Sequence, residues 1–301
     1  MDRAFFCNSG TEANEALIKL ARRYAHKHGL PPVILVAQNG FHGRTMGALS
    51  ATTSNLKYHE GYEPLLPGFV PVPYNDLAAA VAALDGVAAV LIEPIQGEGG
   101  VIPGGRDYLR GLEAACKERG RLFMLDEVQT GIGRTGRWLA AQGLGLKPDA
   151  VALAKGLGGG VPVGAMLART DLAELLGPGS HGTTFGGNPL AMAAVNAVLD
   201  TIKEEDLLAN VLAMSEHLRI ELARLPGVVE VRGTGLLLGV ELACPADRVV
   251  EACFRERLLI NAVRPQTLRL APPLVVGDHE VDEAVATLEK VLAGVLATSI
   301  A

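Results

Sequence analysis

The fold is decided by the stretch Ala150-Val151-Ala152-Leu153-Ala154-Lys155-Gly156-Leu157-Gly158-Gly159-Gly160. An apolar run that ends in a glycine cluster predicts a buried strand followed by a loop. An ammonium at the end of such a strand needs a carboxylate partner, or burial must keep it neutral. A neutral lysine is a nucleophile for aldehydes, and the glycines let a flat partner approach the backbone. The simpler alternative is a lysine whose ammonium reaches water, so other segments must decide.

The composition is that of a globular protein with a large core. The chain has 301 residues, 49% of them hydrophobic, and a formal net charge of −6. The length suggests two domains, and the acidic balance with few aromatic residues gives no support for nucleic-acid binding. The four cysteines lack metal-site and redox-motif spacing, so we expect reduced cytoplasmic thiols and no metal. No signal peptide and no apolar span long enough for a membrane helix is found.

Strands and helices alternate along the first two thirds of the chain. This alternation indicates an α/β fold with a largely parallel sheet and a site at the carboxyl ends of its strands. After residue 204 the pattern changes to a smaller α+β arrangement, so we expect a large domain over 1–200 and a small one over 201–301. The strands of the large domain are predicted at 5–7, 33–36, 69–72, 88–92, 122–125, 150–154 and 164–168.

Two early motifs can bind a charged, flat ligand. Ser9-Gly10-Thr11-Glu12 is a capping box that opens a helix, and its free N–H groups and the Thr11 hydroxyl form a natural phosphate site. An ordinary capped helix is the alternative. The loop Gln38–Thr45 carries Phe41, His42 and Arg44, which could stack on a ring and clamp a carboxylate. A plain surface turn is the alternative there.

Asp126 and Glu127 end the apolar strand Leu122–Leu125. Such a strand resembles the magnesium-binding strand of an ATPase, but that function requires a G-x-x-x-x-G-K-[ST] loop, which the chain lacks. Gly131–Gly136 matches G-x-G-x-x-G, yet Trp138 and Gly143 interrupt the long helix that a dinucleotide site requires. Asp126 is then either a buried carboxylate that faces a cation or a residue that caps a turn.

Later segments supply further charged and polar groups. Glu93 and Glu98 could form an acid/base pair, although we favour a loop that closes the site and gives an arginine its acidic partner. Arg269 lies in an apolar strand and needs a ligand carboxylate or a structural acid. Thr183 and Thr184 belong to a polar, glycine-rich loop over 180–189.

Pyridoxal phosphate is one cofactor that uses all of these pieces. It needs an amine for an imine, an acid opposite its ring nitrogen, a phosphate cup and a stacking face. These groups would be Lys155, Asp126, the helix start at Gly10 and Thr11, and Phe41.

Five stretches carry a resemblance to a known family. They are Asn8-Ser9-Gly10-Thr11-Glu12-Ala13-Asn14-Glu15, Phe41-His42-Gly43-Arg44-Thr45, Glu93-Pro94-Ile95-Gln96-Gly97-Glu98, Asp126-Glu127-Val128-Gln129-Thr130-Gly131 and Ala154-Lys155-Gly156-Leu157-Gly158-Gly159-Gly160. Their joint order is highly specific, and the chain resembles the class III aminotransferases over essentially its whole length. Within that class, Phe41–Ser50 and Leu157–Gly164 are most similar to the members that act on N-acetylornithine.

The resemblance implies the type I fold of PLP-dependent transferases. That fold has a mostly parallel seven-stranded sheet flanked by helices, followed by a smaller α+β C-terminal domain. The resemblance also implies a homodimer with shared active sites. Lys155 would be the Schiff-base lysine and proton shuttle, and Asp126 would pair with the pyridinium. Gln129 would lie near the ring hydroxyl, Gly10 and Thr11 would bind phosphate, and Phe41 would stack on the ring.

The same resemblance assigns substrate roles. Thr184 would reach the phosphate from the other subunit, with Thr183 beside it near the substrate. Arg44 and Arg269 would hold substrate carboxylates, and Glu98 would neutralise Arg269 when an ornithine-type donor is bound. Two arginines suit glutamate, which carries two carboxylates.

The implied reaction moves the terminal amine of N-acetylornithine to 2-oxoglutarate, as in arginine biosynthesis. Its products are N-acetylglutamate semialdehyde and glutamate. The alternatives are another ω-amino donor, namely succinylornithine, succinyl-diaminopimelate, ornithine or 4-aminobutyrate. A further alternative is a truncated chain that binds PLP without efficient turnover. Family members carry an N-terminal segment before the Asn-Ser-Gly-Thr motif, and we expect this chain to lack it, because a domain rarely opens on a buried strand such as 5–7.

Overall fold

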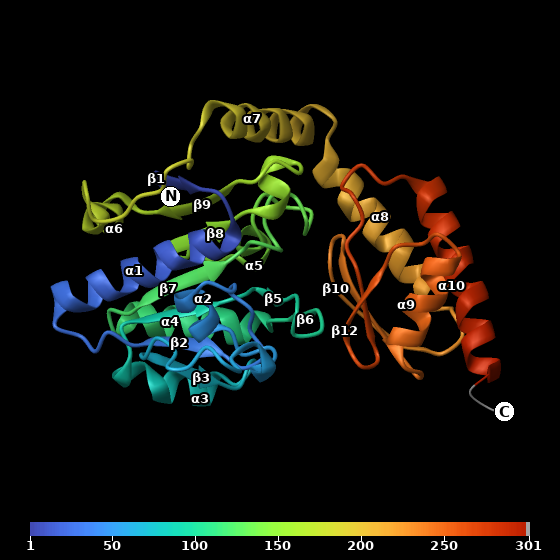
Figure 1. Ribbon diagram of the computed structural model, residues 1–301, viewed down its shortest axis with the longest axis horizontal. Helices are drawn as coiled ribbons and strands as arrows, with labels where there is room; N and C mark the ends of the chain where they lie inside the picture. The colour runs from blue at the N-terminus through green and yellow to red at the C-terminus, as the bar shows by residue number, and fades with distance from the viewer. Residues whose placement is uncertain (299–301) are drawn as a thin grey trace. The chain divides into compact units, whose positions relative to one another are not determined.

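The computed structural model describes residues 1–298 and divides them into two compact units (Figure 1). Unit 1 comprises Met1–Pro94, Gly104–Ile132 and Leu139–Asp200. Unit 2 comprises Ile95–Pro103, Gly133–Trp138 and the chain from Thr201 onward. Two short segments of the first 200 residues therefore belong to the second unit. Each unit is made of several separate stretches of the chain.

Unit 1 contains a seven-stranded sheet of order β1-β9-β8-β7-β4-β2-β3. The five strands from β8 to β3 pair in parallel, whereas β9 and β1 pair antiparallel to their neighbours. The expected α/β fold with a mostly parallel seven-stranded sheet is confirmed. The strands are β1 (Arg3–Cys7), β2 (Ile34–Ala37), β3 (Phe69–Val72), β4 (Ala89–Ile92), β7 (Leu122–Asp126), β8 (Ala150–Leu153) and β9 (Gly164–Ala168).

The sheet is buried on both faces because successive apolar side chains of a strand point to opposite sides. Ile34 and Val36 pack in the cluster that includes Leu17 of the first helix. Leu35, from the same strand, packs in the cluster that includes Leu112 on the other face. Each such side chain contributes about 1.5–3 kcal/mol of burial free energy, so the sheet is a rigid platform for the loops at its edge.

The helices of unit 1 follow the predicted alternation. Ser9 caps the first helix by accepting the Glu12 amide at 3.4 Å, as the capping-box pattern predicted. The reciprocal bond is displaced by one residue, because Glu12 accepts the amide of Asn8 at 2.5 Å. The helices are α1 (Gly10–His28), α2 (Met46–Ala51), α3 (Leu77–Ala83), α4 (Arg106–Glu118), α5 (Ala140–Leu144), α6 (Thr170–Ala173) and α7 (Pro189–Glu204), with short 3-10 turns η1 (Leu56–Tyr58), η2 (Leu84–Gly86), η3 (Lys155–Gly158) and η4 (Glu174–Leu176).

Strand β1 is less buried than the sequence predicted. The sequence predicted a buried strand at 5–7, but among residues 1–298 β1 lies at the edge of the sheet and pairs only with β9. Arg3 and Ala4 are exposed, the two phenylalanines are half-buried, and only Cys7 is buried. Apolar character does not distinguish an edge strand from a central one, which explains the error.

Unit 2 is built on the four-stranded antiparallel sheet β10-β11-β13-β12. Its helices share one apolar core with that sheet, in which Leu218, Leu238 and Leu288 are all buried. The strands are β10 (Val228–Thr234), β11 (Leu237–Leu242), β12 (Asn261–Arg264) and β13 (Thr267–Leu270), and the helices are α8 (Leu207–Leu222), α9 (Ala246–Arg255) and α10 (Asp278–Thr298). This is the smaller α+β arrangement that the sequence predicted.

A small hairpin from the middle of the chain completes unit 2. It consists of β5 (Ile95–Gln96) and β6 (Ile102–Pro103). Val101 is fully buried and clusters with Ile95 and Leu237. The Arg232 guanidinium donates to the Gly100 carbonyl at 2.9 and 3.1 Å. The sequence did not predict this hairpin, because two-residue strands show no periodicity.

Within residues 1–298, none of the helices combines the length and the apolar character needed to cross a bilayer.

Candidate active site

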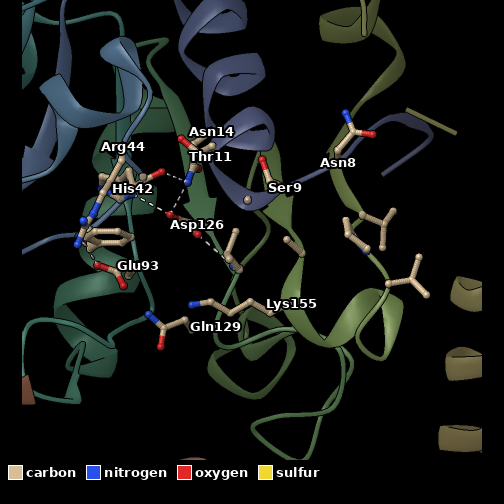
Figure 2. A pocket seen from close by; sticks show the side chains of 18 of the residues that line it. Asn8, Ser9, Thr11, Asn14, His42, Arg44, Glu93, Asp126, Gln129 and Lys155 are labelled. Atoms are coloured by element: carbon tan, nitrogen blue, oxygen red, sulfur yellow. Dashed lines mark hydrogen bonds and ion pairs between the residues drawn. The ribbon is translucent and has the colours of Figure 1, made fainter. Parts of the chain in front are cut away.

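A pocket of about 520 Å³ opens in unit 1 where four parallel strands end (Figure 2). Phe41 and Arg44 follow β2, Glu93 follows β4, Asp126 ends β7 and Lys155 follows β8. The carboxyl edge of a parallel sheet is where ligands bind in open α/β folds. The predicted residues Gly10, Thr11, Phe41, Arg44, Asp126, Gln129 and Lys155 all line this pocket.

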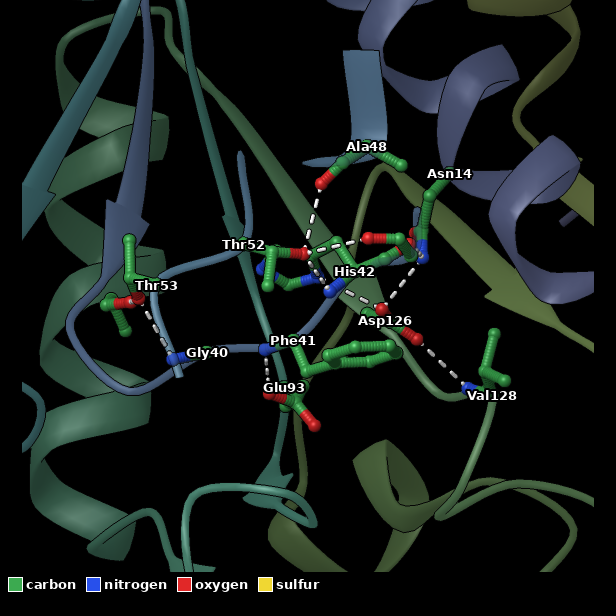
Figure 3. A network of polar contacts seen from close by, with 12 residues as sticks. Asn14, Gly40, Phe41, His42, Ala48, Thr52, Thr53, Glu93, Asp126 and Val128 are labelled. Atoms are coloured by element: carbon green, nitrogen blue, oxygen red, sulfur yellow. Dashed lines mark hydrogen bonds and ion pairs between the residues drawn. The ribbon is translucent and has the colours of Figure 1, made fainter. Parts of the chain in front are cut away.

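Asp126 is an acid of the pocket that several neighbours hold in place (Figure 3). Its side chain is 4% exposed and accepts three hydrogen bonds. Oδ2 accepts from Asn14 Nδ2 at 2.7 Å and from His42 Nδ1 at 2.8 Å. Oδ1 accepts from the Val128 amide at 3.0 Å. These three donors fix the direction of the carboxylate, so Asp126 does more than cap a turn.

His42 is fully buried behind Asp126. Burial by itself lowers the pKa of this imidazole, but the hydrogen bond and the charge of Asp126, with the charge of Glu93, raise the pKa above its ordinary value. Nδ1 carries the proton in its bond to the carboxylate, because a carboxylate can only accept. Nε2 is buried and has no hydrogen-bond partner among the described residues.

The start of α1 borders the pocket and approaches the strand ends closely. A Cβ built on Gly10 would lie 2.7 Å from Val128 Cγ1, which is too close for any side chain. Gly43 has φ +134° and faces Thr11, so a side chain there would be both strained and blocked. The Thr11 hydroxyl bonds the Thr45 hydroxyl at 2.9 Å. The two glycines thus permit the helix start, the Phe41–Arg44 loop and β7 to meet.

Lys155 begins η3, two residues after Leu153, which ends β8. Its φ is +49°, a left-handed conformation that is uncommon for a residue with a side chain. The residue is exposed and not buried at the strand end. This left-handed conformation turns the Lys155 side chain away from the direction of β8. The side chain lines the pocket together with Gln129 (Figure 2).

Phe41 and Arg44 are held by neighbouring groups. The Phe41 amide donates to Glu93 Oε2 at 3.0 Å, and the ring makes an edge contact with Tyr58 at a centroid distance of 6.3 Å. The exposed Arg44 guanidinium lies over the Tyr58 ring, 4.3 Å from its centroid. Glu93 therefore positions the loop, whereas Glu98 belongs to unit 2.

The remaining predicted residues lie away from this pocket or in the other unit. Thr183 and Thr184 line a separate cavity of about 330 Å³ in unit 1, where Thr183 accepts from Asn8 Nδ2 at 3.1 Å. Glu98 and Arg269 form an ion pair at 2.6 Å within unit 2. Arg269 thus has a carboxylate partner, as an arginine in an apolar strand requires.

Sequence reasoning missed Asn14 and the full role of His42. Asn14 is 1% exposed and lies on the buried face of α1 between apolar residues. The only signal in the sequence was a polar amide on that apolar face, and its partner Asp126 is 112 positions away. His42 was noted only as part of a polar loop.

Residues 1–292 match the family described as aminotransferase class-III. The chain belongs to the class III aminotransferases. Acetylornithine aminotransferase 1 of Bordetella bronchiseptica is 50% identical over 296 residues, which cover 96% of this chain and 75% of that protein. The expected family is therefore confirmed.

Solved class III aminotransferase structures share the fold. The N-acetylornithine aminotransferase of Stenotrophomonas maltophilia K279a superposes with a TM-score of 0.83 at 37% identity, over 99% of this chain and 76% of that one. The ornithine aminotransferase of Toxoplasma gondii, whose structure has pyridoxal phosphate at partial occupancy in its active site, gives a TM-score of 0.93 at 36% identity, over 99% and 73%.

Proposed function

We propose that this chain transfers the terminal amine of N-acetylornithine to 2-oxoglutarate and uses pyridoxal phosphate as its cofactor. The products are N-acetylglutamate semialdehyde and glutamate, and the reaction belongs to arginine biosynthesis. One observation carries the proposal. Lys155, Asp126 and the start of α1 meet in one pocket of a chain that is half identical to an acetylornithine aminotransferase.

The pocket fits pyridoxal phosphate in its chemistry and its size. A buried carboxylate with fixed direction suits a protonated ring nitrogen, and the glycine-lined start of α1 suits a phosphate. The volume of about 520 Å³ lies within the range of cofactor pockets. When bound, the cofactor supplies an electrophilic carbonyl and a ring that withdraws electrons from the substrate carbon.

Lys155 supplies the amine that holds the cofactor and, when free, carries a proton to and from the substrate carbon. Its position past the end of β8 supports this role, because the side chain lines the pocket. A fixed proton carrier of this kind typically accelerates a step by about 10²–10⁴-fold. Asp126 keeps the ring nitrogen protonated, and three donors that fix the direction of its carboxylate support this role.

The other pocket residues orient the cofactor. Gly10 and Thr11 bind the phosphate with main-chain N–H groups and the Thr11 hydroxyl, Phe41 stacks on the ring, and Gln129 lies at the ring hydroxyl. The capped start of α1 supports the phosphate role, because its dipole favours an anion. The hydrogen bond from the Phe41 amide to Glu93 supports the stacking role of Phe41, because it fixes the loop that carries the phenyl ring.

Two arginines recognise the substrate carboxylates. Arg44 lies at the pocket and is steadied by the Tyr58 ring. Arg269 binds the second carboxylate of glutamate, and Glu98 neutralises it when N-acetylornithine is the donor. The observed 2.6 Å pair between Glu98 and Arg269 supports this switch, since it is the neutralised arrangement.

The active unit that we propose is a homodimer in the cytoplasm. Thr184 would reach the phosphate of the partner subunit, with Thr183 beside it. In support, Thr184 lies outside the Lys155 pocket of its own chain, and nearby Phe185 and Leu190 are 70% and 73% exposed. Apolar side chains so exposed suit a covered interface. The four free, buried cysteines suit a reducing compartment.

The test is a coupled assay of the purified chain with pyridoxal phosphate, N-acetylornithine and 2-oxoglutarate, in which glutamate is measured. We expect glutamate to form with N-acetylornithine, and we expect the Lys155→Ala variant to form none while retaining its melting temperature. Glutamate formation by that variant would refute the role of Lys155. Borohydride reduction followed by peptide mapping should place the attached cofactor on Lys155.

Ornithine is the second candidate donor. The observation that favours it is the TM-score of 0.93 to the Toxoplasma gondii ornithine aminotransferase. The kcat/KM values for N-acetylornithine, ornithine and 4-aminobutyrate, measured under the same conditions, identify the preferred amino donor. A higher value for ornithine would replace the proposed donor and leave the class of reaction intact.

A further inference from the structure

The two carboxylate oxygens of Asp126 accept different numbers of hydrogen bonds (Figure 3). Oδ2 accepts from both Asn14 Nδ2 and His42 Nδ1, whereas Oδ1 accepts only from the Val128 amide among the contacts described. Each oxygen of a carboxylate has about two acceptor sites. Oδ2 is therefore full, and Oδ1 keeps one acceptor site.

We propose that Asn14 and His42 are positioning residues that fill Oδ2 and so present Oδ1 of Asp126 to the ring N–H of the cofactor. This inference rests on the proposed role of Asp126. It assigns the task to one oxygen of the carboxylate, and it gives two buried side chains of the pocket lining a defined purpose.

Asn14 cannot turn its amide without losing this arrangement. Its Nδ2 donates to Asp126 Oδ2 and to the His42 carbonyl, both at 2.7 Å. Both N–H groups of the amide are therefore used, while Oδ1 of Asn14 is buried without a partner among the described residues. A flipped amide would place its oxygen against two acceptors, so the carboxylate is locked to the backbone of the His42 loop.

His42 is held from its other side by Thr52. The His42 amide donates to Thr52 Oγ1 at 2.9 Å, and that hydroxyl donates to the carbonyl of Gly43 or Ala48 at 3.1 or 2.9 Å. Thr52 is fully buried. Because the backbone is fixed and only Nδ1 of the ring has a partner, the imidazole has one useful orientation, with Nδ1–H on Asp126.

Amide substitutions at position 42 test the assignment. The amide nitrogen of asparagine lies near the place of Nδ1, whereas that of glutamine lies near Nε2, which has no hydrogen-bond partner among the described residues. We expect His42→Asn to bind pyridoxal phosphate within about threefold of the wild-type affinity. We expect His42→Gln to bind it about tenfold more weakly or worse, as for a lost hydrogen bond to a charged group.

The measurement is the dissociation constant of pyridoxal phosphate for the apo protein, by absorbance titration, together with the melting temperature of each apo variant. His26→Asn, on the exposed end of α1, is the matched control and should match wild type. Asn14→Leu removes the other Oδ2 donor and should weaken binding by a similar factor, which keeps the test decisive if His42→Gln does not fold.

Two results would overturn the inference. Wild-type affinity in both His42→Gln and Asn14→Leu would show that Oδ2 need not be filled. Equal weakening by His42→Asn and His42→Gln would reduce His42 to a packing residue. A different result would refute the proposed function itself: no binding by wild type, or Asp126→Asn binding as tightly as wild type.

Discussion

Asp126 and Glu127 are adjacent, buried and acidic, yet their carboxylates accept hydrogen bonds from different parts of unit 1. Asp126 is 4% exposed and accepts from side chains of α1 and of the His42 loop beside the pocket. Glu127 is 1% exposed and accepts from the Ala140 and Ala141 amides at 2.6 and 2.9 Å, and from the Thr130 hydroxyl at 3.0 Å. Consecutive residues at a strand end point to opposite sides. One carboxylate therefore lies at the pocket, and the other holds the start of α5.

The same isosteric change at the two positions gives the largest expected contrast. Asp126→Asn should lower kcat/KM by about 10²–10³-fold, because it removes the preorganised charge that we propose for the ring nitrogen of the cofactor. The melting temperature should fall less than in Glu127→Gln. Steady-state kinetics and thermal melts of both variants provide the comparison. Near-normal turnover by Asp126→Asn would remove this residue from the ring nitrogen.

Glu127→Gln should mainly reduce stability. The glutamine NH₂ cannot accept, so at least one buried donor at the start of α5 loses its partner, which costs about 1–3 kcal/mol. We expect this loss in urea unfolding, while kcat per folded molecule stays close to that of wild type. A large fall in kcat with unchanged unfolding would reverse the roles assigned to the two acids.

Thr130→Val sharpens the contrast with a smaller change. Its hydroxyl donates to Glu127, and it is buried at 1% exposure. Removing this bond while keeping the volume should cost about 1 kcal/mol in the free energy of unfolding. The affinity for pyridoxal phosphate should stay unchanged. Weaker cofactor binding in this variant would show that Glu127 and the pocket are coupled.

The smallest effect is on the pH dependence of stability. Burial raises the pKa of Glu127 above its ordinary 4.5, against the lowering effect of the bonds from Ala141, Ala140 and Thr130. The folded chain therefore binds this proton more tightly than the unfolded chain. The stabilisation from the protonated Glu127 is lost as the pH rises from 4.5 through the raised pKa of the folded chain. The difference in unfolding free energy between wild type and Glu127→Gln should shrink from pH 4.5 upward. A difference that grows would contradict the raised pKa.

The sequence predicted the sheet well because its strands are short apolar runs that are buried on both faces. Residues 34–37 illustrate this, since all four are buried. It did not predict α2 or the β5–β6 hairpin, because six and two residues are too few to show a period. The partly exposed β1 was mistaken for a buried strand, since phenylalanine is common in both.

The candidate site was predictable where residue chemistry is unusual in its setting. Lys155 and Asp126 stand out because each interrupts an apolar strand end. Asn14 does not, because one amide on the buried face of α1 has no neighbouring pattern and its partner is distant in the sequence. The left-handed backbone of Lys155 was equally hidden, because a following glycine cluster predicts a loop but not the conformation of the residue before it.

The hairpin Ile95–Pro103 has a consequence for how the protein is made. Its partners in unit 2, Leu237 and Arg232, are synthesised more than a hundred residues later, which corresponds to roughly 10 s of translation. During that interval the apolar side chains of Ile95 and Val101 have nothing from unit 2 to cover them. A gene fragment that begins at residue 201 would encode Arg269 without Glu98. Unit 2 thus joins segments that are synthesised at different times, and it cannot be exchanged between relatives as one contiguous block.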